Sequence, residues 1–339
     1  MMDFQEFDTD LEDWNALRAS TPIAGLLIGN GASRAVWEDF AYDSLFENAR
    51  TVEEKPLSQS ELSVFDALQT RSFEQVLGAL KTTSRVNKAL AVSSAAPRNR
   101  YYAIKEALIN TVHAVHIPWR LVQPATLSQI NQELRRYRTV FTSNYDLLNY
   151  WAIQHDAQGI DDLFQGADPS FDIGQTASQQ TRVLYLHGGL HLVRNQDGTA
   201  RKLGSTEGTL LGNFAINNTL KTLDDVPLFV SEGPVADKLK TIRSSDYLSF
   251  CYQQLLNHSD ALCIFGHDLG PQDSHLVQAI RQSGGQTLAI SIHPRSKAFI
   301  QNQKRRYTQL FEGMEVTLRF FDSKSHALGA PALSVPVER

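Results

Sequence analysis

Six short apolar runs are spaced along the chain, and each ends in glycine or in a polar turn. They are Ile23–Ile28, Thr139–Thr142, Val183–Leu186, Leu228–Val230, Ala261–Phe265 and Leu288–Ile292. Most are apolar throughout rather than alternating, which is typical of strands covered on both faces, as in a parallel sheet. Helical patterns such as Asp246–Asn257 and Ser274–Ser283 lie between them. This alternation predicts an α/β fold with a Rossmann-like, doubly wound parallel sheet.

The stretch at residues 35–137 has a different pattern. It holds no pattern of a buried strand but several helical ones, including Ser72–Leu80 and Tyr101–His113. We therefore expect a helical insertion after the first strand, packed over the ligand cleft, within a single domain that spans residues 1–339. Two further stretches, 156–181 and 195–223, are rich in glycine and polar residues and are predicted to be long loops.

The charge and the cysteine content narrow the classes of function. The formal net charge is −5, and the densest basic cluster, Lys304-Arg305-Arg306, is expected to form only a solvated helix face. Direct binding of nucleic acid is therefore not expected. No apolar run approaches the ~20 residues that span a bilayer, and the acidic N-terminus does not resemble a secretory signal. The two cysteines, Cys251 and Cys263, are too few for a four-thiolate zinc site, and we expect reduced packing residues in a cytoplasmic protein.

The first motif with chemical content is Gly29-Asn30-Gly31-Ala32-Ser33, directly after the first predicted strand. Glycines at such a turn let backbone N–H groups approach a pyrophosphate closely. The third glycine of the usual dinucleotide fingerprint is missing here. A tight turn without a ligand explains the motif equally well when it is taken alone.

The second motif, Thr142-Ser143-Asn144-Tyr145-Asp146, closes the strand Thr139–Thr142. The carboxyl ends of parallel strands are where α/β sheets bind ligands. Asn144 offers both a donor and an acceptor, and an ionised Asp146 offers acceptors only. Either residue could instead cap the next helix, and capping is the simpler explanation for each one alone.

Two more strand ends carry polar or glycine residues. His187 and two glycines follow the strand Val183–Leu186, and Gly266 follows Ala261–Phe265. A histidine at a strand end suits general-base chemistry because its ordinary pKa is near neutral, although a lone histidine is more often structural. His191 has a leucine on each side and is predicted to be a packing residue.

The order of these motifs along the chain resembles that of the sirtuins. G-x-G-x-S, T-x-N-x-D, H-G and G-x-x-L follow one another between Ile23 and Ser291, and Phe229–Gly233 resembles the stretch after the sirtuin zinc module. Phe40–Glu47 and Tyr185–Gly188, taken with the first motif, are similar to an uncharacterised bacterial family of the sirtuin-like superfamily. Ser72–Leu77 resembles the helical insertion of that wider group, many of whose bacterial members are NAD-consuming defence effectors.

The resemblance implies a role for each matching residue. Gly29, Gly31 and Ser33 would hold the dinucleotide phosphates, and Gly266 would lie under the phosphates and the adenosine ribose. Asn144 would bind the nicotinamide ribose and the attacking water, and Asp146 the carboxamide. His187 would be the general base. Ser291 or His293 would approach the adenine end. We expect the side chains of Asn144 and His187 to project into the cleft rather than the core.

Departures from the sirtuin pattern bear on which reaction of NAD is expected. The zinc-binding cysteine quartet and the proline-containing loop of deacetylases are absent, and the sirtuin T-Q-N is T-S-N here. The resemblance therefore implies an NAD hydrolase that releases nicotinamide and ADP-ribose without a metal, in an antiphage defence setting. ADP-ribosyl transfer, deacylation and a non-catalytic NAD or ADP-ribose sensor stay open as alternatives. A homo-oligomer is expected, and a regulatory protein partner is compatible with this reading.

Overall fold

The computed structural model describes residues 7–40, 45–164, 169–175, 180–195, 197–203, 226–230, 234–285 and 287–336. Seven strands form one sheet in the order β10-β9-β8-β1-β2-β4-β3, and all of its neighbouring strands are parallel. They are β1 (Gly25–Ile28), β2 (Thr139–Thr142), β3 (Ile160–Asp161), β4 (Thr181–Tyr185), β8 (Leu262–Phe265), β9 (Thr287–Ile292) and β10 (Thr317–Asp322).

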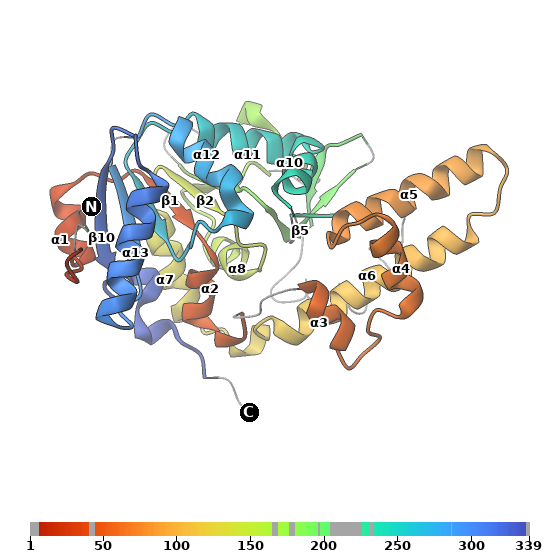
Figure 1. Cartoon of the computed structure of the whole chain (residues 1–339), viewed down its shortest axis with the longest axis horizontal. Coiled ribbons are helices and arrows are strands. Elements are labelled where there is room, and N and C mark those ends of the chain that lie inside the picture. Colours follow the sequence, from red (N-terminus) through yellow and green to blue (C-terminus); the bar gives the residue numbers. More distant parts are fainter. Residues whose placement is uncertain are drawn as a thin grey trace, which may run out of the picture.

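Strand β1 lies at the centre of this sheet. All four of its residues are buried, and it pairs with β2 on one side and with β8 on the other. The chain builds the sheet outward from β1 in one direction through β2 and β4, and in the other through β8, β9 and β10. Helices lie on both sides of the strands (Figure 1). The predicted doubly wound, Rossmann-like parallel sheet is therefore confirmed.

The longer helices follow the strands or precede them. They are α1 (Trp14–Ser20), α2 (Asn30–Val36), α3 (Leu45–Thr51), α4 (Gln59–Ala67), α5 (Phe73–Ala89), α6 (Ala95–Val115), α7 (Pro124–Leu134), α8 (Leu148–His155), α10 (Val235–Arg243), α11 (Asp246–Leu256), α12 (Ser274–Gln282) and α13 (Lys297–Leu310). No helix within the described ranges combines the length and apolar character needed to cross a membrane.

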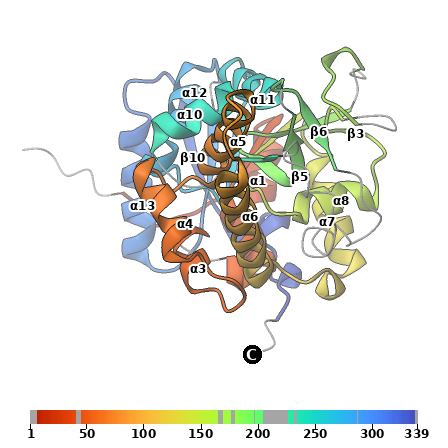
Figure 2. The same ribbon diagram turned by 90° about the vertical axis from the view of Figure 1, so that its right-hand side faces the viewer.

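Helices fill the described part of the chain between β1 and β2, the stretch for which a helical insertion is predicted. The described residues of this stretch form helices and no strand, and Ser72 caps α5 by accepting a hydrogen bond from the Gln75 N–H. Helices α5 and α6 run side by side and project beyond the sheet as an arm (Figures 1 and 2). Helix α5 of this arm is amphipathic, and its buried residues Phe73, Val76 and Leu77 belong to the main core.

A second, smaller sheet corrects the prediction for Leu228–Val230. Strand β7 (Val226–Phe229) pairs antiparallel with β5 (Gly188–Arg194), which also pairs antiparallel with β6 (Ala200–Lys202). Leu228 and Phe229 are buried. A continuous apolar run indicates a strand that is buried on both faces. It does not indicate whether the neighbouring strand is parallel or antiparallel.

The two predicted loops also hold short strands. Strand β3 lies within 156–181 and β6 lies within 195–223, and each is too short to produce a hydrophobic period. Residues 204–225 of the second loop lie outside the described residues. The described parts of these two stretches are therefore loops interrupted by short strands.

The basic cluster on α13 is only partly solvated. Arg305 is exposed, but Lys304 is 6% exposed and its Nζ binds the carboxylate of Asp8 and the carbonyl of Asp10, 2.6 Å away. The same ammonium lies 5.7 Å from the ring centroid of Phe320. The prediction of a solvated face is therefore wrong for Lys304, which joins the N-terminal segment to the sheet.

Two buried histidines accept hydrogen bonds from backbone N–H groups. The Leu147 N–H donates to Nε2 of His116 (3.0 Å), so Nδ1 of that ring carries the proton and donates to the Ile117 carbonyl (2.9 Å). The Leu328 N–H donates to Nδ1 of His326 (3.0 Å). Burial lowers the pKa of His116 to about 4 and that of His326 to about 3. Both rings are therefore neutral at neutral pH.

We predict that the protein loses stability in mild acid. The unfolded chain binds a proton on each histidine near pH 6.5, whereas folded His116 does so near 4, so stability falls as pH drops between these values. At pH 5 each such histidine destabilises the fold by about 2 kcal/mol relative to pH 7. Urea unfolding at the two pH values measures this. His116→Gln should reduce the difference, and replacement of the exposed His155 by Gln should leave it unchanged. Equal stability at pH 7 and pH 5 would contradict the prediction.

Candidate functional site

A cavity of about 490 Å³ opens at the carboxyl ends of β1, β2, β4 and β8. Five of the residues singled out from the sequence line it: Gly31, Asn144, Asp146, His187 and Gly266. The other lining residues are Asn30, Arg34, Phe40, Leu45, Ser143, Tyr145, Val230, Lys238, His267, Asp268, Gln272 and Asp273. The volume lies in the range of small-molecule sites. Phe40 and Leu45 bring the start of the helical insertion to the cavity, while the arm of α5 and α6 extends away from the sheet.

The two glycine turns pack backbone against backbone. The Gly29 N–H donates to the Phe265 carbonyl (2.9 Å), and the Gly31 N–H donates to the Gly266 carbonyl (2.8 Å). A Cβ on Gly31 would lie 2.7 Å from the Gly266 Cα, and Gly266 has a φ of +66°. These glycines are therefore required by the contact between the β1 and β8 turns. Their N–H groups donate within the protein rather than to the cavity.

Ser33 lies below the cavity and joins the second motif to the first. Its hydroxyl donates to Oδ2 of Asp146 (2.5 Å) and accepts from Nδ2 of Asn144 (2.8 Å). The same Nδ2 donates to the Gly29 carbonyl (3.1 Å). Ser33 is 3% exposed and does not line the cavity. Its hydroxyl is thus engaged inside the protein, and the expected direct contact of Ser33 with phosphates does not fit this geometry.

The capping alternative applies to Asp146 and not to Asn144. Oδ1 of Asp146 accepts from the Leu148 N–H at the start of α8 (2.9 Å). Burial raises the pKa of the Asp146 carboxyl, against the hydrogen bonds from Ser33 and Leu148. Asn144 instead bridges to the β1 turn, and among the described residues no hydrogen bond uses its Oδ1. That oxygen is the atom that Asn144 offers to a ligand.

His187 is fixed through both its backbone and its ring. Its carbonyl accepts from the Val230 N–H (2.7 Å), and its Nε2 lies 2.9 Å from Nε2 of His275. The side chains of Asn144 and His187 are buried, with the residues 6% and 4% exposed. Both residues line the cavity, and both are also held by hydrogen bonds inside the protein. His191 packs between Tyr150 and Tyr185, as predicted for a packing residue.

Charged and titratable groups gather beside His187. Lys238 Nζ lies 2.8 Å from Oδ1 of Asp273, and Nε2 of His267 lies 4.0 Å from Oδ2 of the same carboxylate. Burial alone would raise the pKa of Asp273, but His187 and His267 in their charged forms, together with the Lys238 ammonium, hold it well below its usual range. Burial also lowers the pKa of His275 to about 4 and that of His187 well below its ordinary value. The site at neutral pH thus combines an ionised Asp273–Lys238 pair with neutral histidines.

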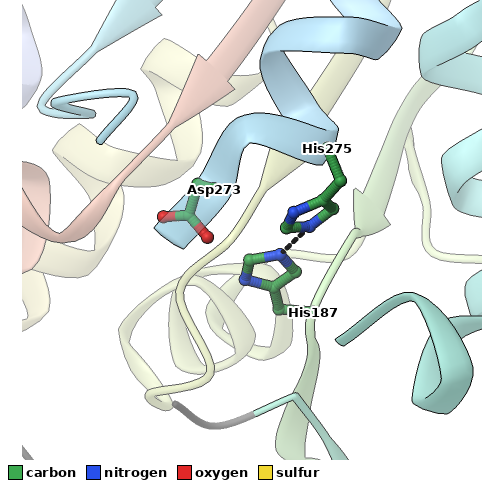
Figure 3. A group of neighbouring side chains, drawn as sticks. All are labelled: His187, Asp273 and His275. Carbon is green, nitrogen blue, oxygen red and sulfur yellow. Dashed lines mark hydrogen bonds between the residues drawn. The ribbon is translucent and has the colours of Figure 1, made fainter. Parts of the chain in front are cut away.

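Asp273 and His275 are functional candidates that the sequence did not reveal. They lie at the start of α12, and His275 is 88 residues from its partner His187. The one available signal was their position on the segment after β8, next to the glycine turn. The ligand atoms of His187, Asp273 and His275 all lie within 4.8 Å of one another (Figure 3).

Ser291 lies behind the cavity. Its hydroxyl accepts a hydrogen bond from the Gly266 N–H (3.0 Å), and it does not line the cavity. The structure therefore places it under the β8 turn, where it orients Gly266. The Cys251 and Cys263 thiols are both buried and unpaired in disulfides, as expected for packing residues.

Comparisons with known proteins give a family and distant structural likenesses. A model of the family described as a domain of unknown function, DUF4917, matches residues 26–328. No curated protein matches the sequence. The solved structures that match include a Sir2 mutant with a p53 peptide and NAD, which is 12% identical with a TM-score of 0.34 and covers 88% of this chain and 98% of that one. A Sir2–p53 peptide–NAD+ structure is 14% identical with a TM-score of 0.33, covering 88% and 97%. A structure concerning sirtuin substrate affinity is 14% identical with a TM-score of 0.35, covering 87% and 96%.

Part of the sequence resemblance lies outside the described residues. Residues 41–44 belong to the stretch Phe40–Glu47, and residues 231–233 belong to Phe229–Gly233. The described residues that adjoin these two segments, Phe40, Leu45 and Val230, line the cavity.

We predict that Gly31→Ala destabilises the protein by about 1–3 kcal/mol, because the new Cβ meets the Gly266 backbone and neither turn can give way. Gly78→Ala is the matched control. No atom lies within 4 Å of a Cβ at that position in α5, so the substitution should be neutral or stabilise by roughly 0.5–1 kcal/mol. Chemical denaturation of both variants measures the difference. Equal stability of the two would show that the turns do not constrain each other.

Proposed function

This chain belongs to the DUF4917 family, and from its site we propose that it binds NAD and hydrolyses the nicotinamide–ribose bond. Water is the acceptor, and the products are nicotinamide, ADP-ribose and a proton. NAD is a substrate here, and the reaction uses no resident metal.

One observation carries the proposal: residues from four separate strand ends line a single cavity. Gly31, Asn144, His187 and Gly266 follow β1, β2, β4 and β8. The chain adds strands first on one side of β1 and then on the other, so the strand order reverses at β1. Open α/β sheets bind nucleotides in the crevice at such a point. The order of these motifs along the chain also resembles that of the sirtuins. Together these features favour a dinucleotide over other small molecules.

The reaction proceeds by loss of nicotinamide through an oxocarbenium-like transition state. Asp146 binds the carboxamide, since each oxygen of its carboxyl keeps a lone pair beyond the bonds from Ser33 and Leu148. Asn144 uses Oδ1 to hold the nicotinamide ribose and the water. His187 accepts a proton from a hydroxyl or orients the ribose. Gly29, Gly31 and Gly266 keep the backbone low enough for the phosphates to lie over the turns.

Two alternatives differ in what happens to bound NAD. Transfer to another nucleophile gives an ADP-ribosylated or deacylated product, and a sensor binds NAD or ADP-ribose without breaking a bond. Incubating the purified full chain with NAD and separating nicotinamide from ADP-ribose distinguishes all three. Binding without cleavage under every condition would replace the hydrolase with the sensor.

We predict that His187→Ala and Asn144→Ala each lower NAD cleavage by about 10²-fold or more, since a positioned proton-transfer or hydrogen-bonding group typically contributes at least that much. Asn144→Ala should also lower stability by about 1–3 kcal/mol, because the Gly29 carbonyl and the Ser33 hydroxyl lose a buried donor. Thermal melts and turnover are measured on the same samples.

The control is His155→Ala, which removes an exposed histidine at the end of α8 that does not line the cavity. It should turn over NAD at the native rate. Variants at His187 and Asn144 that melt early but retain native turnover would show that neither residue acts on the substrate.

Assembly and setting remain parts of the same proposal. An enzyme that destroys NAD must be restrained, and assembly is one physical way to couple a trigger to the site. We therefore predict a cytoplasmic homo-oligomer, open to a regulatory protein partner, in antiphage defence. Light scattering with and without NAD checks the assembly, and a monomer in both samples would contradict it.

A further inference from the structure

The hydrogen bond between His187 and His275 is nearly in line with both rings. The two Nε2 atoms are 2.9 Å apart, the ring centroids are 5.1 Å apart and the ring planes differ by 24°. Each Nε2 lies one ring radius from the centroid of its own ring. Because the centroid separation exceeds the separation of the nitrogens by nearly two ring radii, the two rings meet edge to edge (Figure 3). One Nε2 therefore donates its proton to the other.

This geometry does not fit a metal ion shared by the two nitrogens. A zinc ion lies about 2.0–2.1 Å from each ligating nitrogen, on the lone-pair axis of its ring. Two Nε2 atoms that point at each other across 2.9 Å leave no such position between them. Asp273, the third group within 4.8 Å, already pairs with Lys238. The cluster is thus a hydrogen-bonded histidine pair next to an ion pair.

The second nitrogen of His275 decides which ring donates. Its Nδ1 is buried and has no hydrogen-bond partner among the described residues. A proton on that nitrogen would be an orphaned buried N–H, which folded proteins avoid more strongly than an unused acceptor. His275 therefore carries its proton on Nε2 and donates it to Nε2 of His187. Since His187 is neutral, its own proton lies on Nδ1.

Asp273 lies close to both rings, because the ligand atoms of His187, Asp273 and His275 all lie within 4.8 Å of one another (Figure 3). Its carboxylate acts on both histidines, so the assignment of the proton rests on the unpartnered Nδ1 of His275. Because His275 occupies Nε2, Nδ1 is the nitrogen through which His187 meets a ligand in the cavity.

We propose that His275 is a positioning residue that holds His187 with its proton on Nδ1, so that His187 offers the ligand a hydrogen-bond donor rather than a base. The ligand atom that it meets is an acceptor oxygen, and on the proposed function that atom is a ribose hydroxyl of NAD. His187 then orients the ribose while nicotinamide leaves. The proton of the attacking water passes to bulk water through the open cavity, so no protein group need take it.

The first test reads the proton directly and needs no turnover. Two-bond ¹H–¹⁵N spectra of the histidine rings in the full chain at neutral pH report the tautomer, and His187 should show a protonated Nδ1 and a bare Nε2. His275→Gln keeps an amide donor near the former Nε2 and should preserve this pattern. His275→Phe removes the donor and should let the proton redistribute. A protonated Nε2 on His187 in the wild-type chain overturns the proposal.

The second test separates a donor from a base by turnover. The amide nitrogen of Asn lies close to where Nδ1 of histidine lies, and it can donate but cannot take a proton. His187→Asn should keep NAD turnover within about 10-fold of the native rate, whereas a lost general base costs about 10²–10⁴-fold. His275→Phe should lower turnover and His275→Gln should restore it. His187→Asn as inactive as His187→Ala overturns the donor role.

The two tests fail in different ways. If the chain never cleaves NAD, the proposed function fails, while the tautomer of His187 still decides this inference. One equivalent of zinc that copurifies with the wild-type chain and is absent from His275→Gln would overturn the hydrogen-bonded pair itself.

Discussion

The close contact between the β1 and β8 turns is the constraint on which the site depends. Gly31 and Gly266 meet backbone to backbone, and the two N–H···O bonds between the turns leave no space for a Cβ. Ser291 fixes the Gly266 N–H from the neighbouring strand. With the β1 turn held in this way, Ser33 at the next turn of α2 is brought to Asn144 and Asp146. The glycines are thus required for the contact between the two turns, and the same absence of side chains leaves the backbone open to a ligand in the cavity.

Burial opposes charge around this surface. It raises the pKa of Asp146 against the hydrogen bonds from Ser33 and Leu148, and it lowers the pKa of His187 and His275. The Asp273–Lys238 ion pair lies at the cavity wall. A preformed set of donors and acceptors suits a substrate that carries its own charge, as the nicotinamide ring of NAD does, because the protein groups need not reorganise when that charge is lost.

Sequence patterns predicted the elements that burial makes visible. The central strands are apolar on both faces, so Gly25–Ile28 and Leu262–Phe265 could be placed nearly to the residue. Strand direction leaves no such mark, and β7 pairs antiparallel in the smaller sheet instead of joining the parallel one. Strand-end chemistry was predictable where a polar residue directly follows an apolar run, as with Asn144 and His187. Asp273 and His275 follow a turn instead, and only the folded chain brings them to His187.

Ion pairs between residues far apart in the sequence could not be predicted from the sequence either. Lys304 reads as part of a basic run on a solvated helix, and its partner Asp8 lies 296 positions away. Neither residue carries a local signal of burial. The ammonium of Lys304 also lies over the Phe320 ring, so the buried lysine keeps favourable partners for its charge.

His187 is held in place at its backbone and at its ring. Its carbonyl is held by Val230 beside β7, and Gly188 follows with a φ of +68° where a Cβ would meet the Leu228 carbonyl. Its ring is held by His275, whose second nitrogen has no partner in the described part of the chain. Gly188 adopts this φ without strain because it has no Cβ, whereas the buried unpaired nitrogen destabilises the folded state. An apolar pair at positions 187 and 275 would avoid that penalty, so stability does not explain the two histidines. Fixing one imidazole edge toward the cavity does, because a group that acts on a ligand gains from being held in one orientation and one tautomer.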